Sequence, residues 1–199
     1  MNYPELRQAD VQDAKLYADR SVMVKDLIQP GGIVAEVGVA AGYFTRFLLE
    51  ALKPKKFVGF DIFTMHQHPI IWGRPQEELF EGKTQLDFYR QKFPGIETEV
   101  GLAHETMEKY PDGYFDFIYI DADHSYESVK RDANVAARKL SANGTIFFND
   151  YIMFDHMCMG EYGVVQAANE FIVSRGWKVI GFSFQHKMFC DIAVARIHS

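Results

Sequence analysis

The sequence predicts an α/β fold with a mostly parallel, doubly wound sheet of seven strands, helices on both faces and an antiparallel strand in a carboxyl-terminal hairpin. Two observations support this prediction. Short apolar, β-branched runs alternate along the chain with segments of helical periodicity. The last two apolar runs are joined by only a few polar residues, which is the length of a hairpin link. The 199 residues are expected to form a single domain, 1–199.

The predicted strands are bounded by glycine, proline or acidic residues, and the helices by changes in apolar periodicity. We expect strands at residues 33–37, 56–60, 96–100, 115–120, 145–148, 177–184 and 189–197, with residues 185–187 as the hairpin link. We expect helices at residues 44–52, 85–93, 105–110, 125–140 and 164–175, the fourth capped by Ser125 and followed by a connection ending at Asn143-Gly144. Residues 1–30 are expected to form one or two N-terminal helices, because apolar residues recur there among charged ones.

The composition limits the classes of partner. There are 21 Lys and Arg against 27 Asp and Glu, a formal charge of −6, which does not favour nucleic acid as a partner. Two cysteines are too few for a disulfide framework and fit a reducing compartment. The sequence predicts neither a signal peptide nor a membrane span. We therefore expect a cytoplasmic protein whose partners are small molecules or proteins.

One segment, residues 62–80, does not fit the alternation of strands and helices. It holds two prolines, a glycine and several aromatic residues between a strand and the helix that comes next. A connection of that length is usually functional. We expect it to be a lid or a substrate loop, with Trp72, His66 and His68 as its most distinctive residues.

A glycine-containing turn comes after the first strand, in the segment EVGVAAG that begins at Glu36. Gly38 and Gly42 allow a tight turn, and the first amides of the next helix have no partner within that helix. The spacing is GxxxG rather than GxGxxG, which argues against a dinucleotide pyrophosphate. A tight corner without any ligand is the alternative interpretation.

Asp61 ends the second strand, where an acidic side chain can accept hydrogen bonds from both hydroxyls of a ribose. Taken alone, such an aspartate can equally cap a helix or lie in a solvated turn. The glycine-containing turn and Asp61 together give a stronger signal than either gives alone. They indicate a ligand at the carboxyl ends of the strands.

Four polar residues come at the ends of two further strands: Asp121 and His124 after one, Asn149 and Asp150 after the next. Carboxylate and amide oxygens are hard ligands that suit Mg²⁺, and a neutral histidine beside them can act as a general base. The alternative is that the two aspartates cap helices and His124 lies on the surface. The sequence thus predicts a divalent metal on Asp121, Asn149 and Asp150.

These motifs occur in an order that resembles a known family. The segments EVGVAAGYFTRFLLE, GFDIF, FDFIYIDADHSYESVKRD, GTIFFNDY and GVVQAANEF resemble the class I S-adenosylmethionine-dependent methyltransferases. The nearest resemblance is to the macrocin O-methyltransferase type of small-molecule enzymes, and it covers most of residues 31–176. The resemblance implies a Rossmann-like fold.

The resemblance also implies roles for individual residues. Cofactor binding falls to Glu36, Gly38, Val39, Gly42, Phe44, Asp61, Ile62, Ala103, His104 and Asp121. The catalytic residues are His124 and Asp121, and the metal ligands are Asp121, Asn149 and Asp150. The sequence departs from the family pattern in the turn, where Ala40 replaces the middle glycine, and at Ala103 and Asn149, where acids are common.

The expected function is therefore the transfer of a methyl group from S-adenosyl-L-methionine to a hydroxyl of a small molecule. Mg²⁺ would bind the acceptor hydroxyl and His124 would take its proton. One alternative is a metal-independent methyltransferase acting on oxygen or nitrogen. Others are a nicotinamide-dependent oxidoreductase, a nucleotide-sugar transferase that uses Asp121 and Asp123, and a cofactor-binding protein without catalysis. A homodimer through the N-terminal helices or the hairpin is also expected.

Overall fold

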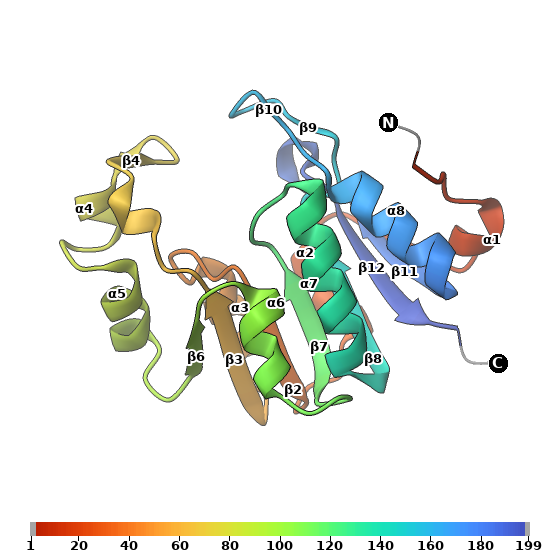
Figure 1. Ribbon diagram of the computed structural model, residues 1–199, viewed down its shortest axis with the longest axis horizontal. Helices are drawn as coiled ribbons and strands as arrows, with labels where there is room; N and C mark the ends of the chain where they lie inside the picture. The colour runs from red at the N-terminus through yellow and green to blue at the C-terminus, as the bar shows by residue number, and fades with distance from the viewer. Residues whose placement is uncertain (1–2, 198–199) are drawn as a thin grey trace.

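The computed structural model describes residues 3–197 and contains one mixed sheet of eight strands, in the order β1-β11-β12-β8-β7-β2-β3-β6 (Figure 1). The strands are β1 (Lys15–Tyr17), β2 (Ile33–Val37), β3 (Lys56–Asp61), β6 (Glu97–Val100), β7 (Phe115–Ile120), β8 (Leu140–Phe148), β11 (Trp177–Ser183) and β12 (Asp191–Arg196). The predicted α/β fold with a mostly parallel sheet is confirmed, but the sheet has eight strands rather than seven.

The helices alternate with these strands. They are α1 (Gln8–Val11), α2 (Arg20–Leu27), α3 (Tyr43–Leu52), α4 (Gln76–Leu79), α5 (Gln85–Lys92), α6 (Ala103–Thr106), α7 (Tyr126–Lys139) and α8 (Val164–Arg175). Three short 3₁₀ helices are η1 (Met65–Gln67), η2 (Met107–Lys109) and η3 (His186–Met188). No helix within residues 3–197 is long and apolar enough to cross a membrane.

Strand direction determines where polar groups can gather. Strands β6, β3, β2, β7 and β8 are parallel, whereas β12 is antiparallel to both of its neighbours, β8 and β11. The carboxyl ends of the five parallel strands therefore share one edge of the sheet, here called the carboxyl edge, with the amino end of β12. Residues from distant parts of the chain meet there.

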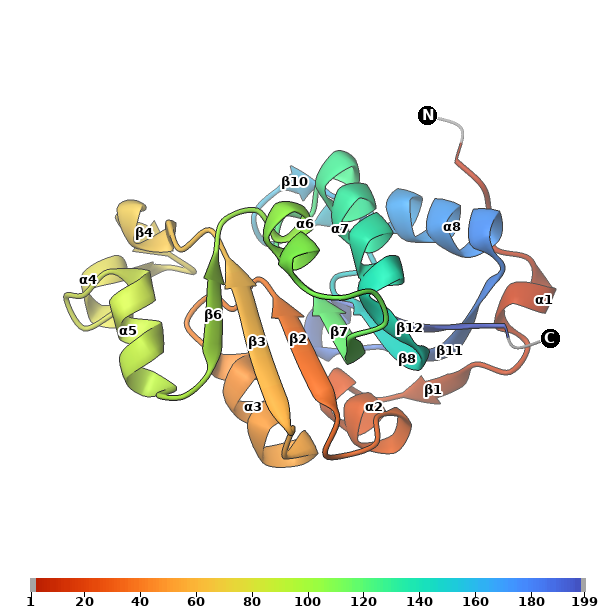
Figure 2. The ribbon, with the colours of Figure 1, turned by 60° about the horizontal axis from the view of Figure 1, so that its bottom comes forward.

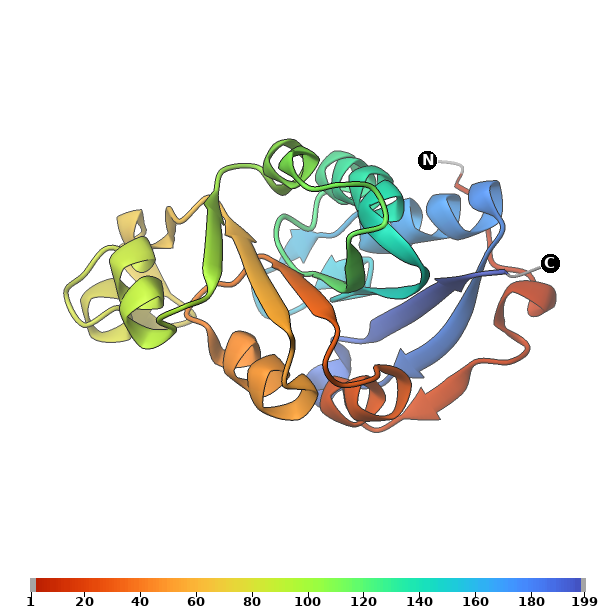
Figure 3. The ribbon, with the colours of Figure 1, turned by 90° about the horizontal axis from the view of Figure 1, so that it is seen from below.

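Helices cover both faces of the sheet: α6, α7 and α8 lie on one side, and α2 and α3 on the other (Figure 3). Alternate residues of β7 supply the two apolar layers. Ile118 and Ile120 pack in the cluster that contains residues of α6, α7 and α8, and Phe117 and Tyr119 pack with residues of α2 and α3. Residues 117–120 of β7 are buried and apolar at every position, as expected for a strand covered on both faces, and this run makes β7 recognisable in the sequence.

The N-terminal segment differs from the prediction of helices alone. Between α1 and α2 the chain forms β1, an edge strand that pairs in parallel with β11. Tyr17 is buried, and its hydroxyl donates to Asp26 at 2.6 Å. Asp19 then caps α2 by accepting from the amides of Ser21 and Val22. A three-residue edge strand is too short to show its own periodicity, and its pairing partner lies more than 160 residues away in the sequence.

Three local predictions need correction. Residues 140–144 belong to β8, because their backbone continues the strand directly from α7, which ends at Lys139. The predicted hairpin is present, but its link is longer than 185–187 and contains η3. Ser125 occupies the N-cap position of α7 without a capping side-chain bond. The carboxylate of Asp123 instead accepts from the Ser125 amide at 2.9 Å and from the Ser128 hydroxyl at 2.8 Å.

Two short ribbons project from the carboxyl edge (Figures 1 and 2). One is formed by β4 (Ile70–Ile71) and β5 (Arg74–Pro75), the other by β9 (Phe154–Asp155) and β10 (Gly160–Glu161). The first belongs to segment 62–80, which is therefore structured: η1, the ribbon and α4 pack on α5, with the Phe80 and Phe88 rings 5.6 Å apart. Trp72 remains exposed. The use of this segment as a lid or substrate loop stays a prediction.

Arg196 in β12 ties the end of α7 to the sheet. Its guanidinium donates to the carbonyls of Ala137, Leu140 and Ser141 and lies 5.0 Å from the centre of the Trp177 ring. The last carbonyls of a helix have no partner within the helix, so a charged donor there satisfies groups that would otherwise be left unpaired.

We predict that Arg196→Met lowers the free energy of unfolding by about 2 kcal/mol, because the carbonyls lose a charged donor while the apolar stem is kept. Urea unfolding followed by circular dichroism measures this change. Lys178→Met in the adjacent strand removes only an ion pair with Asp13 and should change stability by less than about 1 kcal/mol. Equal effects of the two substitutions would contradict the role of Arg196.

Candidate active site

The turn between β2 and α3 lies against the end of β7. Gly38 has φ +86°, and a Cβ atom there would lie 1.9 Å from the backbone oxygen of Asp121. The Asp121 amide in turn donates to the Val37 carbonyl at 2.7 Å. Gly42 also has a positive φ, and a side chain there would collide with Phe93. Only glycine fits at these two positions, so the predicted turn is held in direct contact with Asp121.

Ala40 occupies the position in the turn at which the family pattern has its middle glycine. It adopts φ +46°, a left-handed conformation that costs an alanine about 1 kcal/mol. Its amide donates to Asp61 at 3.1 Å, and its carbonyl accepts from the Gln85 side chain at 3.1 Å. Both backbone groups are thus satisfied. The departure from the family pattern therefore leaves the turn intact.

Glu36 lies beneath this turn and is almost completely buried. Its carboxyl group accepts a hydrogen bond from the Thr45 hydroxyl of α3. Burial raises the pKa of Glu36 well above its usual value, because the charged form loses its hydration. Glu36 therefore joins β2 to α3, and it does so below the surface at which a ligand would bind.

Asp61, the predicted ribose acid, is held by the glycine-containing turn. One oxygen accepts from the amides of Val39 and Ala40 at 3.0 and 3.1 Å, and the other accepts from Phe63 at 2.7 Å. Burial raises the pKa of Asp61, and these hydrogen bonds oppose that rise. The carboxylate thus lies at the predicted position, with backbone amides as its partners.

Gln85 is a residue that the sequence analysis missed. Its side chain is fully buried, donates to Asp61 at 3.2 Å and accepts from the Met65 amide at 2.9 Å. It therefore connects the glycine-containing turn, the end of β3 and segment 62–80. A glutamine at the start of a helix carries no sequence signal for such a role.

Residues 101–104, which include the predicted cofactor contacts Ala103 and His104, lie beside Asp61, because the Gly101 amide donates to the Asp61 carbonyl at 3.0 Å. The side chains of Ile62 and Leu102 are exposed here, whereas Ala103 is buried. His104 is held by Asp132 in α7: its amide donates to the carboxylate at 3.1 Å, and its Nδ1 lies 3.4 Å from it. Burial raises the pKa of Asp132 to about 6.

The second part of the site lies at the ends of β7 and β8. His124 Nε2 lies 3.5 Å from Asp121 Oδ1 and 3.6 Å from Asp150 Oδ2, and the His124 ring stacks on Tyr162 at 4.4 Å. Burial lowers the pKa of His124, but the neighbouring carboxylates outweigh burial and raise it above its usual value. Burial and the Asp121 carboxylate raise the pKa of Asp150 to about 7. His124 is thus held between two carboxylates.

These residues do not fit the predicted metal. Within residues 3–197, no three His, Cys, Asp or Glu side chains form a group that could hold a metal ion. His124 Nε2 lies between Asp121 and Asp150, and the Nδ2 atom of the buried Asn149 side chain donates to Asp191 at 3.0 Å. The structure therefore gives no support for Mg²⁺ on Asp121, Asn149 and Asp150.

A buried network beside this cluster was also missed. Asp191, at the start of β12, is fully buried and accepts hydrogen bonds from Tyr119, Asn149 and Gln185 at 2.9 to 3.1 Å. Burial raises the pKa of Asp191 to about 6. The Tyr119 hydroxyl in turn accepts from Arg20 of α2 at 2.6 Å. No local motif marks these residues, because their partners come from opposite ends of the chain.

Phe44, another predicted cofactor contact, lies at this network. Its ring is 4.4 Å from the Arg20 guanidinium and 4.4 Å from the Tyr119 ring. It is half-buried on the side of the sheet that α2 and α3 cover. Phe44 therefore contacts the network rather than the turn at Asp61.

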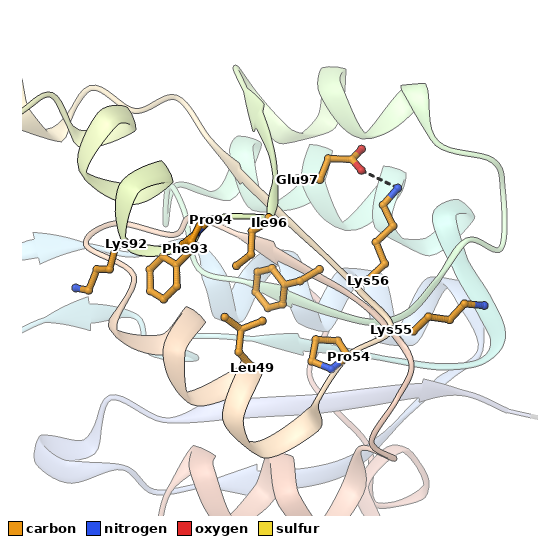
Figure 4. Close-up of a pocket in the computed structure, with 11 residues that line it drawn as sticks. Leu49, Pro54, Lys55, Lys56, Lys92, Phe93, Pro94, Ile96 and Glu97 are labelled. Atoms are coloured by element: carbon orange, nitrogen blue, oxygen red, sulfur yellow. Dashed lines mark ion pairs between the residues drawn. The ribbon is translucent and has the colours of Figure 1, made fainter.

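A cavity of about 480 Å³ lies elsewhere, at the amino end of β3 and β6 (Figure 4). Its lining combines apolar residues, among them Leu49, Phe93 and Ile96, with charged ones. The side chains of Lys55 and Lys92 point outward in Figure 4, and Lys56 pairs with Glu97 at 2.7 Å. None of the predicted site residues lines this cavity.

The fold and this arrangement point to a class of protein, the methyltransferases with a mostly parallel Rossmann-like sheet. A family model described as a methyltransferase domain matches residues 35–151, which is more than half of the chain. The chain belongs to this methyltransferase family. The comparison with curated proteins found no match.

Solved structures share the fold. An S-adenosylmethionine-dependent methyltransferase from Mesorhizobium loti has a TM-score of 0.59 and 16% identity, over 84% of this chain and 92% of that one. One from Aquifex aeolicus has a TM-score of 0.59 and 15% identity, over 89% and 93%. A Bacillus subtilis tRNA methyltransferase, TrmK, has a TM-score of 0.55 and 14% identity, over 92% and 67%. At these identities the similarity shows the fold alone.

We predict that Gly38→Ala weakens binding of S-adenosylhomocysteine at least about tenfold, or ~1.4 kcal/mol, because the new Cβ would displace the end of β7. Calorimetric titration measures the affinity. Gly113→Ala is the matched control: Gly113 has φ +72° but open space around it, so the variant carries similar backbone strain without the collision. Unchanged affinity in a folded Gly38→Ala variant would contradict this account of the turn.

Proposed function

We propose that this protein transfers the methyl group of S-adenosylmethionine to a hydroxyl of a small molecule, with His124 as the general base. The observation that carries the proposal is the imidazole of His124 between Asp121 and Asp150, at the end of the strand that touches the glycine-containing turn. A methyl donor bound at that turn would lie beside a group able to take a proton.

Several features support binding of the cofactor along the carboxyl edge. Gly42, the N-cap of α3, has no side chain to satisfy the first amides of the helix, which suits a ligand carboxylate. Asp61 lies where a carboxylate can accept from the hydroxyls of a ribose, once its contacts with the turn rearrange. Exposed Ile62 and Leu102 offer apolar surface for an adenine ring.

The reaction needs little chemistry from the protein. The hydroxyl oxygen attacks the sulfonium methyl, the bond from that carbon to sulfur breaks, and S-adenosylhomocysteine leaves. Holding the two reactants in line can lower the barrier by roughly 7 to 11 kcal/mol. The acceptor must also lose its proton, and a nearby base assists that step.

His124 suits this role because two carboxylates stabilise its protonated form. Its Nε2 atom is buried and faces Asp121 and Asp150, so Nδ1 is the nitrogen left to receive a proton from the acceptor. Tyr162 stacks on the ring and fixes its plane. Asp121 therefore acts by orienting the base, as a carboxylate does in other acid–base pairs. No step in this scheme passes through a metal ion.

A small acceptor is favoured over a polyanion by the charge of the chain. The formal net charge is −6. A nucleic acid would have to approach this acidic protein against electrostatic repulsion. This argument separates the proposed acceptor from that of the tRNA methyltransferase with the same fold.

The first test is calorimetric titration of S-adenosylhomocysteine into the protein, once with Mg²⁺ and once with excess EDTA. We expect saturable binding with the same affinity in both, because the turn, Asp61 and Ile62 involve no metal. An acceptor screen with S-adenosylmethionine would come next, comparing hydroxyl compounds with amines of similar shape. Absence of binding in both titrations would overturn the proposed function.

The second test is His124→Ala. We predict that methylation of the hydroxyl acceptor slows by about 10²- to 10⁴-fold, as loss of a general base requires, while S-adenosylhomocysteine affinity stays within a few-fold. His156→Ala is the control, because His156 is an exposed histidine near the same edge of the sheet. A His124→Ala variant with wild-type turnover would show that His124 is not the base.

A further inference from the structure

Arg20 brings a positive charge to the acidic cluster, which consists of Asp121 and Asp150. It lies outside the segment that matches the methyltransferase family model. It is the first residue of α2, whereas the match begins at residue 35. Its Nη1 atom donates to the Tyr119 hydroxyl at 2.6 Å and lies 3.8 Å from Asp121 Oδ2. Its guanidinium also lies 4.4 Å from the centre of the Phe44 ring. Arg20 therefore contacts β7 and α3 at once.

A closed ring of hydrogen bonds fixes the position of Arg20. The Arg20 side chain donates to Tyr119, and Tyr119 donates to Asp191 at 2.9 Å. Asp191 accepts from the Gln185 side chain at 3.1 Å, and the oxygen of that same side chain accepts from the Arg20 amide at 3.3 Å. Both the backbone and the side chain of Arg20 are thus held, which leaves the guanidinium little freedom to move away.

The ring also contacts the predicted metal ligands. The Nδ2 atom of Asn149 donates to Asp191. Asp121 has one oxygen 3.8 Å from Arg20 and the other 3.5 Å from His124. The Asp121 side chain is only 27% exposed, so a cation beside it is poorly screened by water. The Arg20 cation and the His124 imidazole therefore already flank the carboxylate that was predicted to bind Mg²⁺.

We propose that Arg20 is the built-in cation of this site: it balances Asp121 permanently and fixes the orientation of that carboxylate toward His124, so that the cluster neither needs nor binds a divalent ion. This inference rests on the proposed function for its location. Arginine suits the role better than lysine, because its planar group can donate to Tyr119, face Asp121 and stack on Phe44 together. Arg20 is a positioning residue, since it reaches the base only through Asp121.

The experiment is a calorimetric titration of Mg²⁺ alone, over the millimolar range, into the wild-type protein and into Arg20→Met. We expect no saturable binding to the wild type. We expect Arg20→Met to bind Mg²⁺ at least about tenfold more tightly than the wild type does, because removing the cation leaves Asp121 and Asp150 with unbalanced charge. Lys25→Met is the matched control, since Lys25 is an exposed residue of the same helix and its loss changes the net charge equally.

Saturable Mg²⁺ binding by the wild type would overturn the inference, and so would no gain of binding in a folded variant that lacks the charge. Arg20→Gln, which keeps a donor for Tyr119, replaces Arg20→Met if the latter fails to fold by circular dichroism. A gain of equal size in Lys25→Met would also overturn it, because the effect would then be one of net charge. The probe is the metal ion alone, so failure to bind S-adenosylhomocysteine would defeat the proposed function without affecting this test.

Discussion

The contact between the glycine-containing turn and the end of β7 is the constraint on which the site depends. Strand β2 lies between β3 and β7, and the chain proceeds first to β3 on one side and later to β7 on the other. Sheets of this kind bind ligands at the point where the order reverses. Here the backbones of Gly38 and Asp121 touch, with no room for a Cβ atom between them. This contact fixes the distance between the glycine-containing turn and the acidic cluster.

Electrostatic interactions among buried side chains also organise the site. Burial raises the pKa values of Asp150 and Asp191 to about 7 and about 6, because the interior favours their neutral forms. The structure offsets this with donors from distant elements: Arg20 from α2, Tyr119 from β7 and Gln185 from the loop before β12. Asp121 lies where this network meets His124. The N-terminal segment and the hairpin thus contribute to a site whose core belongs to the matched domain.

The family match and the geometry of the site support different conclusions about this protein. The matched segment identifies a methyltransferase, and a shared fold accommodates many acceptors. The solved structures with this fold include a tRNA methyltransferase. Part of the site lies beyond residues 35–151: Arg20, Gln185 and Asp191 together surround the acidic cluster. The proposed hydroxyl acceptor and the proposed independence from a metal both depend on these three residues.

The sequence by itself determined the alternation of strands and helices, since burial on both faces makes strands such as β7 continuously apolar. It also located the glycine-containing turn and Asp61, because these occupy fixed places relative to strand ends. Only the tertiary structure decided that β1 adds an eighth strand, that Gln85 joins the turn to segment 62–80, and that Arg20 faces Asp121. Each of these depends on a partner far away in the sequence, and local periodicity carries no information about such partners. The structure does not support the metal prediction, for the same reason: residue types at strand ends indicate what could bind an ion, but not which side chains already balance their charge.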